Sequence, residues 1–337
     1  MPEFTVLFAD PKNEEDLNWI QQLEPAEPFK VLAPEDESDQ ALRQLLPQAD
    51  ALVTQDRVID ADMIAAAPRL KLIQRYGRRP DGVDVEAARE AGVTVATMPL
   101  RGCIAVAELA ITLVLALSKN LVEAHQATVT GAYRELDVEP MRTSQRRHNF
   151  QWMNLPGLLE VYGYTLGIIG FGEIGTETAR RARAFGMEVL YNKRSRLPAE
   201  VEESEGVTFA TKDEILQTAD FVHLSTPLTP ETEKMIGARE LELMKPSAFL
   251  VNTCRGGVVD EDALVEALNE GKIAGAGLDV FVYEPIPHDH PLLECENVIL
   301  TPHIGGGTGG AREKQMVDVL SNVAAFAQGG DVSHRVV

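Results

Sequence analysis

The chain has 337 residues, of which 45% are hydrophobic and 25% charged, so it is long enough for two domains and has the composition of a folded globular protein. Its 31 Lys and Arg residues against 52 Asp and Glu give a net charge of −21, which disfavours nucleic acid and anionic membrane surfaces as partners. Three scattered cysteines without a C-x-x-C pair argue against a disulfide framework, and we expect no metal site.

Short apolar runs alternate with helix-length stretches over the first hundred residues. Strands are predicted at 4–9, 51–53, 70–73 and 93–95. This alternation is typical of a parallel sheet covered by helices on both faces.

A long apolar helix is predicted from residue 103 to about 124. Its apolar run, 104–117, contains Glu108 and is shorter than the ~18 residues that span a bilayer, so we expect a buried helix. The first ten residues also lack a signal-peptide pattern, and we expect a cytoplasmic protein. The next stretch, 130–163, has no clean period; it is either a functional or interface segment or a solvated excursion.

A second alternating series predicts six strands, at 165–169, 189–191, 221–224, 248–251, 274–280 and 298–300. An amphipathic stretch around 316–323 predicts a last helix that returns to the first domain. The fold class is therefore α/β with two doubly wound parallel-sheet domains. We expect a Rossmann-type domain at 102–302, inserted in a flavodoxin-like domain formed by 1–101 and 303–337.

A glycine-rich loop stands between the strand at 165–169 and a predicted helix. Its glycines are Gly170, Gly172 and Gly175, with Glu173 and Ile174 between them. This spacing gives a tight turn, a close backbone approach to a pyrophosphate and close helix packing. Three glycines can also simply build a turn, but the strand before and the helix after favour dinucleotide binding.

The strand that follows this helix ends without a carboxylate. Asn192, Lys193 and Arg194 stand where an Asp or Glu would bind the adenosine ribose, and Arg196 adds another cation. Cations attract a 2′-phosphate, so we predict NADP in preference to NAD; an exposed basic turn is the alternative.

Three polar side chains follow later strands of the same series. They are Arg255, Glu284 and His303. Ligands bind where parallel strands end, so these side chains are expected to converge near the reactive ring of the cofactor.

Several motifs occur in order along the chain: the glycine loop, Thr226-Pro-Leu-Thr, Met244-Lys-Pro, the Arg255 and Glu284 segments, and Thr301-Pro-His-Ile-Gly-Gly. Together they resemble the D-isomer-specific 2-hydroxyacid dehydrogenase family, which includes glyoxylate/hydroxypyruvate reductases and phosphoglycerate dehydrogenases. The resemblance implies that Arg255 binds the substrate carboxylate and polarises its carbonyl, that His303 is the general acid/base and that Glu284 pairs with it. It also implies cofactor contacts at Thr226, Pro227, Thr253, Cys254, Asp279 and Gly305. Asp279 would bond the nicotinamide carboxamide, although a loop or capping role is an alternative.

These residue types suit the reduction of a 2-oxo acid, which needs a hydride and a proton on the carbonyl oxygen. Histidine titrates near neutrality, and a neighbouring carboxylate favours its imidazolium form. Arginine offers a permanently charged fork for a carboxylate and a developing oxyanion.

The resemblance is weaker after the strand at 70–73. Gly77 and Arg78 match the loop whose backbone binds the substrate carboxylate in the family, but Arg79 and Pro80 replace small residues. Arg78, with Arg79, is a hypothetical site for a second anionic group of the substrate, and solvent exposure is the alternative. Arg101 is another candidate to reach the substrate.

Two other functions are compatible with the same Arg, Glu and His residues. One is a nucleotide-sensing binding protein like the corepressors of the family, and the other is a phosphite-type dehydrogenase acting on a small anion. We expect a small 2-oxo or 2-hydroxy acid as substrate, no regulatory extension, and a homodimer formed through the cofactor domains.

Overall fold

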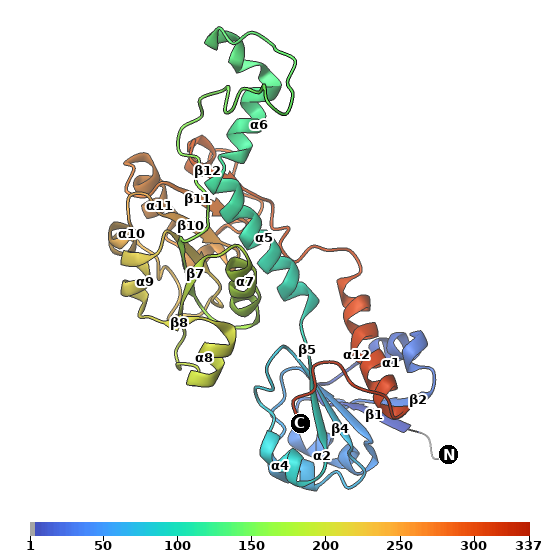
Figure 1. The fold of residues 1–337 in the computed structure, drawn as a ribbon. Helices are drawn as coiled ribbons and strands as arrows, with labels where there is room; N and C mark the ends of the chain where they lie inside the picture. The colour runs from blue at the N-terminus through green and yellow to red at the C-terminus, as the bar shows by residue number, and fades with distance from the viewer. Residues whose placement is uncertain (1–3) are drawn as a thin grey trace. The chain divides into compact units, whose positions relative to one another are not determined.

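The computed structural model describes residues 4–337 and divides into two compact units (Figure 1). The terminal unit consists of the residues up to Gly102 together with Gly309–Val337, and the central unit is Cys103–Thr308. The sequence predicts the second boundary between residues 302 and 303, but in the structure it lies between Thr308 and Gly309. The reason is that the backbone N–H groups of Ile304 and Gly305 donate to Asp279, which keeps this loop in the central unit.

The terminal unit is built on a five-stranded parallel sheet with the order β2-β1-β3-β4-β5. This is the flavodoxin-like order, so the predicted fold class of this unit is confirmed. The strands are β1 (Phe4–Phe8), β2 (Phe29–Leu32), β3 (Ala51–Thr54), β4 (Leu72–Tyr76) and β5 (Thr94–Met98).

Helices cover both faces of this sheet because neighbouring strand residues point to opposite sides. Val6 and Phe8 pack with α1 and α12, while Leu7 packs with α2, α3 and α4. The last helix therefore returns to the first unit, as predicted. The helices are α1 (Glu14–Gln21), α2 (Asp39–Leu45), α3 (Ala61–Ala65), α4 (Val85–Glu90) and α12 (Ala311–Ala327), with 3₁₀ turns η1 (Glu24–Ala26) and η2 (Leu46–Gln48).

The central unit contains a seven-stranded parallel sheet with the order β12-β11-β10-β9-β6-β7-β8. Six of these strands follow the doubly wound dinucleotide-binding order, so the predicted Rossmann fold is confirmed. The strands are β6 (Thr165–Ile169), β7 (Glu188–Asn192), β8 (Thr208–Phe209), β9 (Phe221–Leu224), β10 (Phe249–Asn252), β11 (Gly275–Leu278) and β12 (Val298–Leu300).

Two helix layers enclose the central sheet. α5 and α7 pack on one face, and α9, α10 and α11 pack on the other. The helices are α5 (Arg101–Ser118), α6 (Leu121–Thr130), α7 (Glu173–Ala184), α8 (Ala199–Glu205), α9 (Lys212–Thr218), α10 (Ala238–Leu243) and α11 (Glu261–Asn269), with 3₁₀ turns η3 (Ala132–Leu136), η4 (Gly256–Val258) and η5 (Pro291–Glu294).

The predicted helix from 103 to about 124 is two helices. The chain breaks at Asn120, whose φ of +50° is left-handed, a conformation that asparagine tolerates better than most residues. α5 is long and apolar enough to cross a bilayer by length and composition, but half of it is buried inside the protein. Its buried side chains, among them Leu113 and Val114, belong to the core of the central unit.

Candidate active site

The glycine-rich loop joins β6 to α7 in the way that the sequence predicts. A Cβ at Gly170, where φ is +96°, would lie 2.5 Å from the Ser225 carbonyl oxygen, so only glycine fits. A Cβ at Gly175 would lie 2.6 Å from the Gly170 carbonyl oxygen. Gly172 is the N-cap of α7, and a Cβ there would meet nothing within 4 Å. Open space at a helix N-terminus suits a pyrophosphate, so the loop fits a dinucleotide.

A cavity of about 560 Å³ lies beside this loop, where the strands of the central sheet end. The predicted cofactor residues that line it are Ile174, Thr226, Pro227, Thr253, Cys254 and Asp279, and two predicted catalytic residues, Arg255 and His303, line it as well. The cavity is also lined by four residues that were not predicted from the sequence: Val106, Ser225, Leu228 and Gly306. Ser225 directly follows β9, so its position at a strand end could have indicated a place at the site. Val106 lies on an apolar helix, and nothing in its sequence context indicates a binding role.

His303, which lines this cavity, is paired with Glu284. His303 Nδ1 lies 2.6 Å from Glu284 Oε2, and the Phe281 N–H donates to Glu284 Oε1 at 3.1 Å. Burial raises the pKa of Glu284, but its hydrogen bonds and the nearby charge of Arg255 outweigh this, and the pKa lies below its ordinary value. The carboxylate therefore stays ionised and orients the imidazole ring, which leaves Nε2 as the nitrogen open to a substrate.

Arg255 stands on a tightly held loop after β10. The buried Asn252 side chain accepts from the Cys254 N–H at 3.0 Å and donates to the Arg255 carbonyl oxygen at 3.1 Å. A Cβ at Gly256 would lie 1.9 Å from the Phe281 carbonyl carbon, so this loop touches the segment that leads to Glu284. Among residues 4–337, no carboxylate forms an ion pair with the exposed Arg255 guanidinium, which leaves it able to bind an anion.

Asp279 organises the loop that carries His303. This carboxylate is 1% exposed and accepts hydrogen bonds from Thr301 Oγ1 at 2.6 Å and from the N–H groups of Ile304 and Gly305 at 2.9 Å. The loop role that the sequence left open for Asp279 is thus present, and Asp279 is also one of the residues that line the cavity. Gly305 is tied to Asp279, while the neighbouring Gly306 lines the cavity.

Comparison with known protein families identifies this arrangement. The model for the NAD binding domain of D-isomer specific 2-hydroxyacid dehydrogenases matches residues 111–305, which is more than half of the chain. The chain belongs to this family. It is accordingly an NAD(P)-dependent oxidoreductase of 2-hydroxy acids.

Individual relatives agree with this placement. A glyoxylate reductase of Thermococcus onnurineus is 45% identical over 308 residues, covering 90% of this chain and 88% of the relative. A D-3-phosphoglycerate dehydrogenase of Methanocaldococcus jannaschii is 38% identical over 335 residues, covering 98% of this chain and 59% of the relative. Among solved structures, an acyclic imino acid reductase in complex with NADPH and D-Arg is 27% identical, with a TM-score of 0.55 and coverage of 99% and 100%.

At the end of β7, the sequence predicts a cluster of cations for a 2′-phosphate, but in this dehydrogenase one of them, Arg196, is paired with a carboxylate. Arg196 forms two 2.8 Å contacts with Glu202 and lies over the Phe209 ring, so its charge is already used. The Asn192 side chain donates to the Ala210 carbonyl oxygen at 2.9 Å. Lys193 and Arg194 follow the same strand end and stay the predicted residues for a 2′-phosphate.

The predicted substrate residues of the first domain lie in the terminal unit. Gly77 has a φ of +104°, and its N–H donates to the Met98 carbonyl oxygen at 2.7 Å, so the chain turns at this glycine directly after β4. Arg78 and Arg79 are half-buried, with Arg79 Nε 3.3 Å from Asp81 Oδ2, so solvent exposure does not describe them.

Arg101 is already paired within the terminal unit. Its Nη2 donates to Asp318 Oδ1 at 2.9 Å, and its Nε donates to the other oxygen of the same carboxylate. The idea that Arg101 reaches the substrate therefore loses its basis.

Two further titratable residues, Cys254 and His223, lie at or next to the cavity. Burial raises the pKa of the Cys254 thiol, which agrees with a lining rather than a nucleophilic role. His223 is fully buried, and burial lowers its pKa to about 4. His223 Nε2 lies 2.9 Å from Thr253 Oγ1, and Nδ1 has no partner among the described residues.

Proposed function

We propose that this dehydrogenase reduces a small 2-oxo acid, with glyoxylate as the leading candidate, and prefers NADPH. The observation that carries the proposal is the 2.6 Å contact between His303 and Glu284 at a cavity that Arg255 also lines. The 45% identity to a protein named glyoxylate reductase supports the choice of substrate.

The three side chains have separate roles in the proposed reaction. Arg255 binds the substrate carboxylate and stabilises the negative charge that develops on the carbonyl oxygen. His303 donates its Nε2 proton to that oxygen, and in the reverse direction it accepts the hydroxyl proton. Glu284 holds Nδ1 and stabilises the protonated ring until the transfer.

The dinucleotide supplies the hydride when it is bound. Gly170, Gly172 and Gly175 would hold its pyrophosphate at the start of α7, and the cavity residues after β9 and β10 would hold the rest. The preference for NADPH is supported by the absence of a carboxylate at the end of β7 and by Lys193 and Arg194 next to it.

Gly77 and Arg78 are proposed to bind the substrate from the terminal unit. A second anionic group on the substrate, such as a phosphate, is the competing idea for Arg78 and Arg79. A faster reaction with glyoxylate or hydroxypyruvate than with a phosphorylated or dicarboxylic 2-oxo acid would exclude that second anion.

We also propose a homodimer. Nine of the seventeen large hydrophobic side chains that are exposed in residues 4–337 lie between residues 121 and 162. α6 buries none of its residues, and a helix with apolar residues on the surface is typical of an interface.

Absorbance at 340 nm tests the proposed activity directly. Purified protein with NADPH and glyoxylate should oxidise the cofactor, and a His303→Ala variant should lose about 100-fold or more in kcat. Tight NADPH binding without turnover of any 2-oxo acid would instead favour the nucleotide-sensing alternative. NAD(P) reduction with phosphite would favour the small-anion dehydrogenase.

A further inference from the structure

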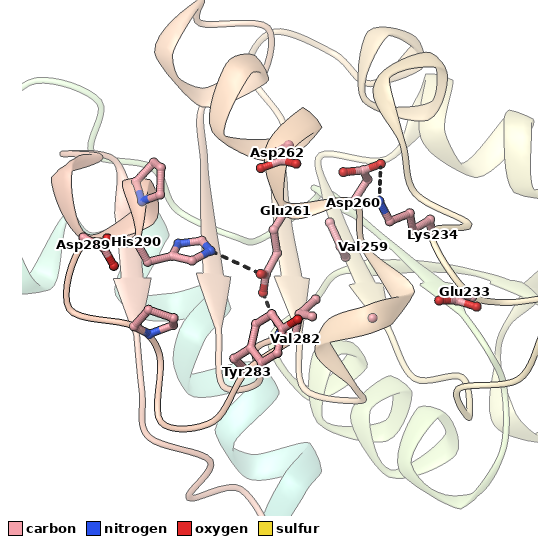
Figure 2. A pocket seen from close by; sticks show the side chains of 13 residues that line it. Glu233, Lys234, Val259, Asp260, Glu261, Asp262, Val282, Tyr283, Asp289 and His290 are labelled. Carbon is pink, nitrogen blue, oxygen red and sulfur yellow. Dashed lines mark hydrogen bonds and ion pairs between the residues drawn. The ribbon is translucent and has the colours of Figure 1, made fainter.

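A second group of polar residues contacts the segment that leads to Glu284. It borders a cavity of about 460 Å³, which is lined by Val282, Tyr283, His290 and the start of α11 (Figure 2). Glu261, the first residue of α11, is central to this group, with a side chain that is 12% exposed.

Glu261 uses both carboxylate oxygens. Oε1 accepts from the Val282 N–H at 2.9 Å, and Oε2 lies 3.3 Å from His290 Nε2 (Figure 2). His290 Nδ1 accepts from the Leu292 N–H at 3.3 Å, so the ring proton is on Nε2 and points to Glu261. His290 therefore fixes the Glu261 carboxylate in place.

The Val282 N–H is adjacent to the N–H that orients Glu284. The Phe281 N–H donates to Glu284 Oε1, and Glu284 Oε2 holds His303. Two consecutive N–H groups of one turn are thus bound by two different carboxylates. If the contact between Glu261 and the Val282 N–H is lost, the turn can rotate and change the contact between the Phe281 N–H and Glu284.

We propose, on the basis of the proposed function, that Glu261 is a positioning residue for proton transfer: by holding Val282 it sets the geometry of the Glu284–His303 pair. His290 supports it by fixing its carboxylate.

The acidic neighbours of Glu261 do not make this contact. Asp260 pairs with Lys234 at 3.1 Å, and the exposed Asp262 forms no hydrogen bond or ion pair within residues 4–337 (Figure 2). Both lie at the start of the same helix, so they share its electrostatic environment with Glu261. Asp262→Ala is therefore a matched control for Glu261→Ala.

A double-mutant cycle tests the proposal. Glu261→Ala should lower kcat for glyoxylate reduction about threefold to tenfold while the Kd for NADPH stays within twofold. In a Glu284→Gln background the same substitution should cost less than twofold, because its effect passes through Glu284. Glu261→Gln, which keeps an acceptor for the Val282 N–H, should recover most of the loss, and Asp262→Ala should leave kcat unchanged.

Two further measurements separate positioning from general destabilisation. A well-placed Glu284 carboxylate favours the protonated form of His303. In Glu261→Ala, His303 should therefore lose its proton at a lower pH, which moves the alkaline limb of the pH profile for reduction to lower pH. Hydrogen exchange of the peptide covering 281–284 should become faster in Glu261→Ala and not in Asp262→Ala.

The proposal is overturned if Glu261→Ala costs the same factor in both backgrounds, or if it lowers stability without changing kcat or the pH profile. Failure of the proposed function would look different. The wild-type protein would then reduce no 2-oxo acid, whereas hydrogen exchange at 281–284 would still report whether Glu261 holds the turn.

Discussion

The proposed preference for NADPH is assigned to Lys193 and Arg194 in the basic turn after β7, in which Arg196 is bound by Glu202. We expect kcat/KM to favour NADPH over NADH, and we expect Arg194→Ser to reduce the NADPH value about tenfold, the loss of one charge-assisted hydrogen bond. The NADH value should change little. Arg196→Ser removes the same charge two residues away and should leave the ratio of the NADPH and NADH values of kcat/KM within about twofold. An equal effect of both variants, or a wild-type preference for NADH, would contradict the assignment.

The individual site residues were predictable to the extent that they stand at strand ends. Arg255 and His303 follow β10 and β12, and the carboxyl ends of parallel strands meet at one edge, so the sequence places them together. The residues that hold these groups were not predictable. The Asn252 side chain bonds the Arg255 carbonyl oxygen of the loop that directly follows it, and Glu261 accepts from the Val282 N–H of a separate segment. The residue types alone do not show that either side chain makes such a contact.

At the scale of elements, the active site depends on the close approach of η4 to the segment after β11. Gly256→Ala would place a Cβ 1.9 Å from the Phe281 carbonyl carbon and 2.3 Å from the Val282 nitrogen. Backbone must move, so we expect about 1–3 kcal/mol of destabilisation in urea unfolding and a separation of Arg255 from Glu284 that lowers kcat/KM. Gly102→Ala, where a Cβ meets nothing within 4 Å, should not lower the unfolding midpoint; equal midpoints for the two variants would refute the contact.

Elements with a strong apolar pattern were predicted, and weak ones were not. β2 (Phe29–Leu32) is half-exposed and β8 (Thr208–Phe209) has two residues, so neither forms a clear apolar run. The break between α5 and α6 rests on one backbone conformation, that of Asn120. The apolar pattern continues through this residue at Leu121 and Val122, so periodicity alone could not show the break.

At the scale of the whole molecule, the sequence predicts the insertion of one domain in another, but the second boundary depends on tertiary contacts. Residues 303–308 look like a connection after the last strand. Asp279, more than twenty residues earlier, binds two of their N–H groups and keeps them with the central unit. Such a pairing appears only in the folded chain.

The exposed apolar side chains of 121–162 make the assembly state testable. Val129 and Phe150 are 68% and 82% exposed in the single chain, so Val129→Glu and Phe150→Glu should cost little folding energy but place charges in a buried interface. Light scattering should give twice the 36.9 kDa chain mass for the wild type and a lower mass for the double variant. Val58→Glu, at a residue of the terminal unit that is 63% exposed, should leave the mass unchanged. A monomeric wild type at micromolar concentration, or a double variant that keeps the full mass, would show that this surface does not join two copies.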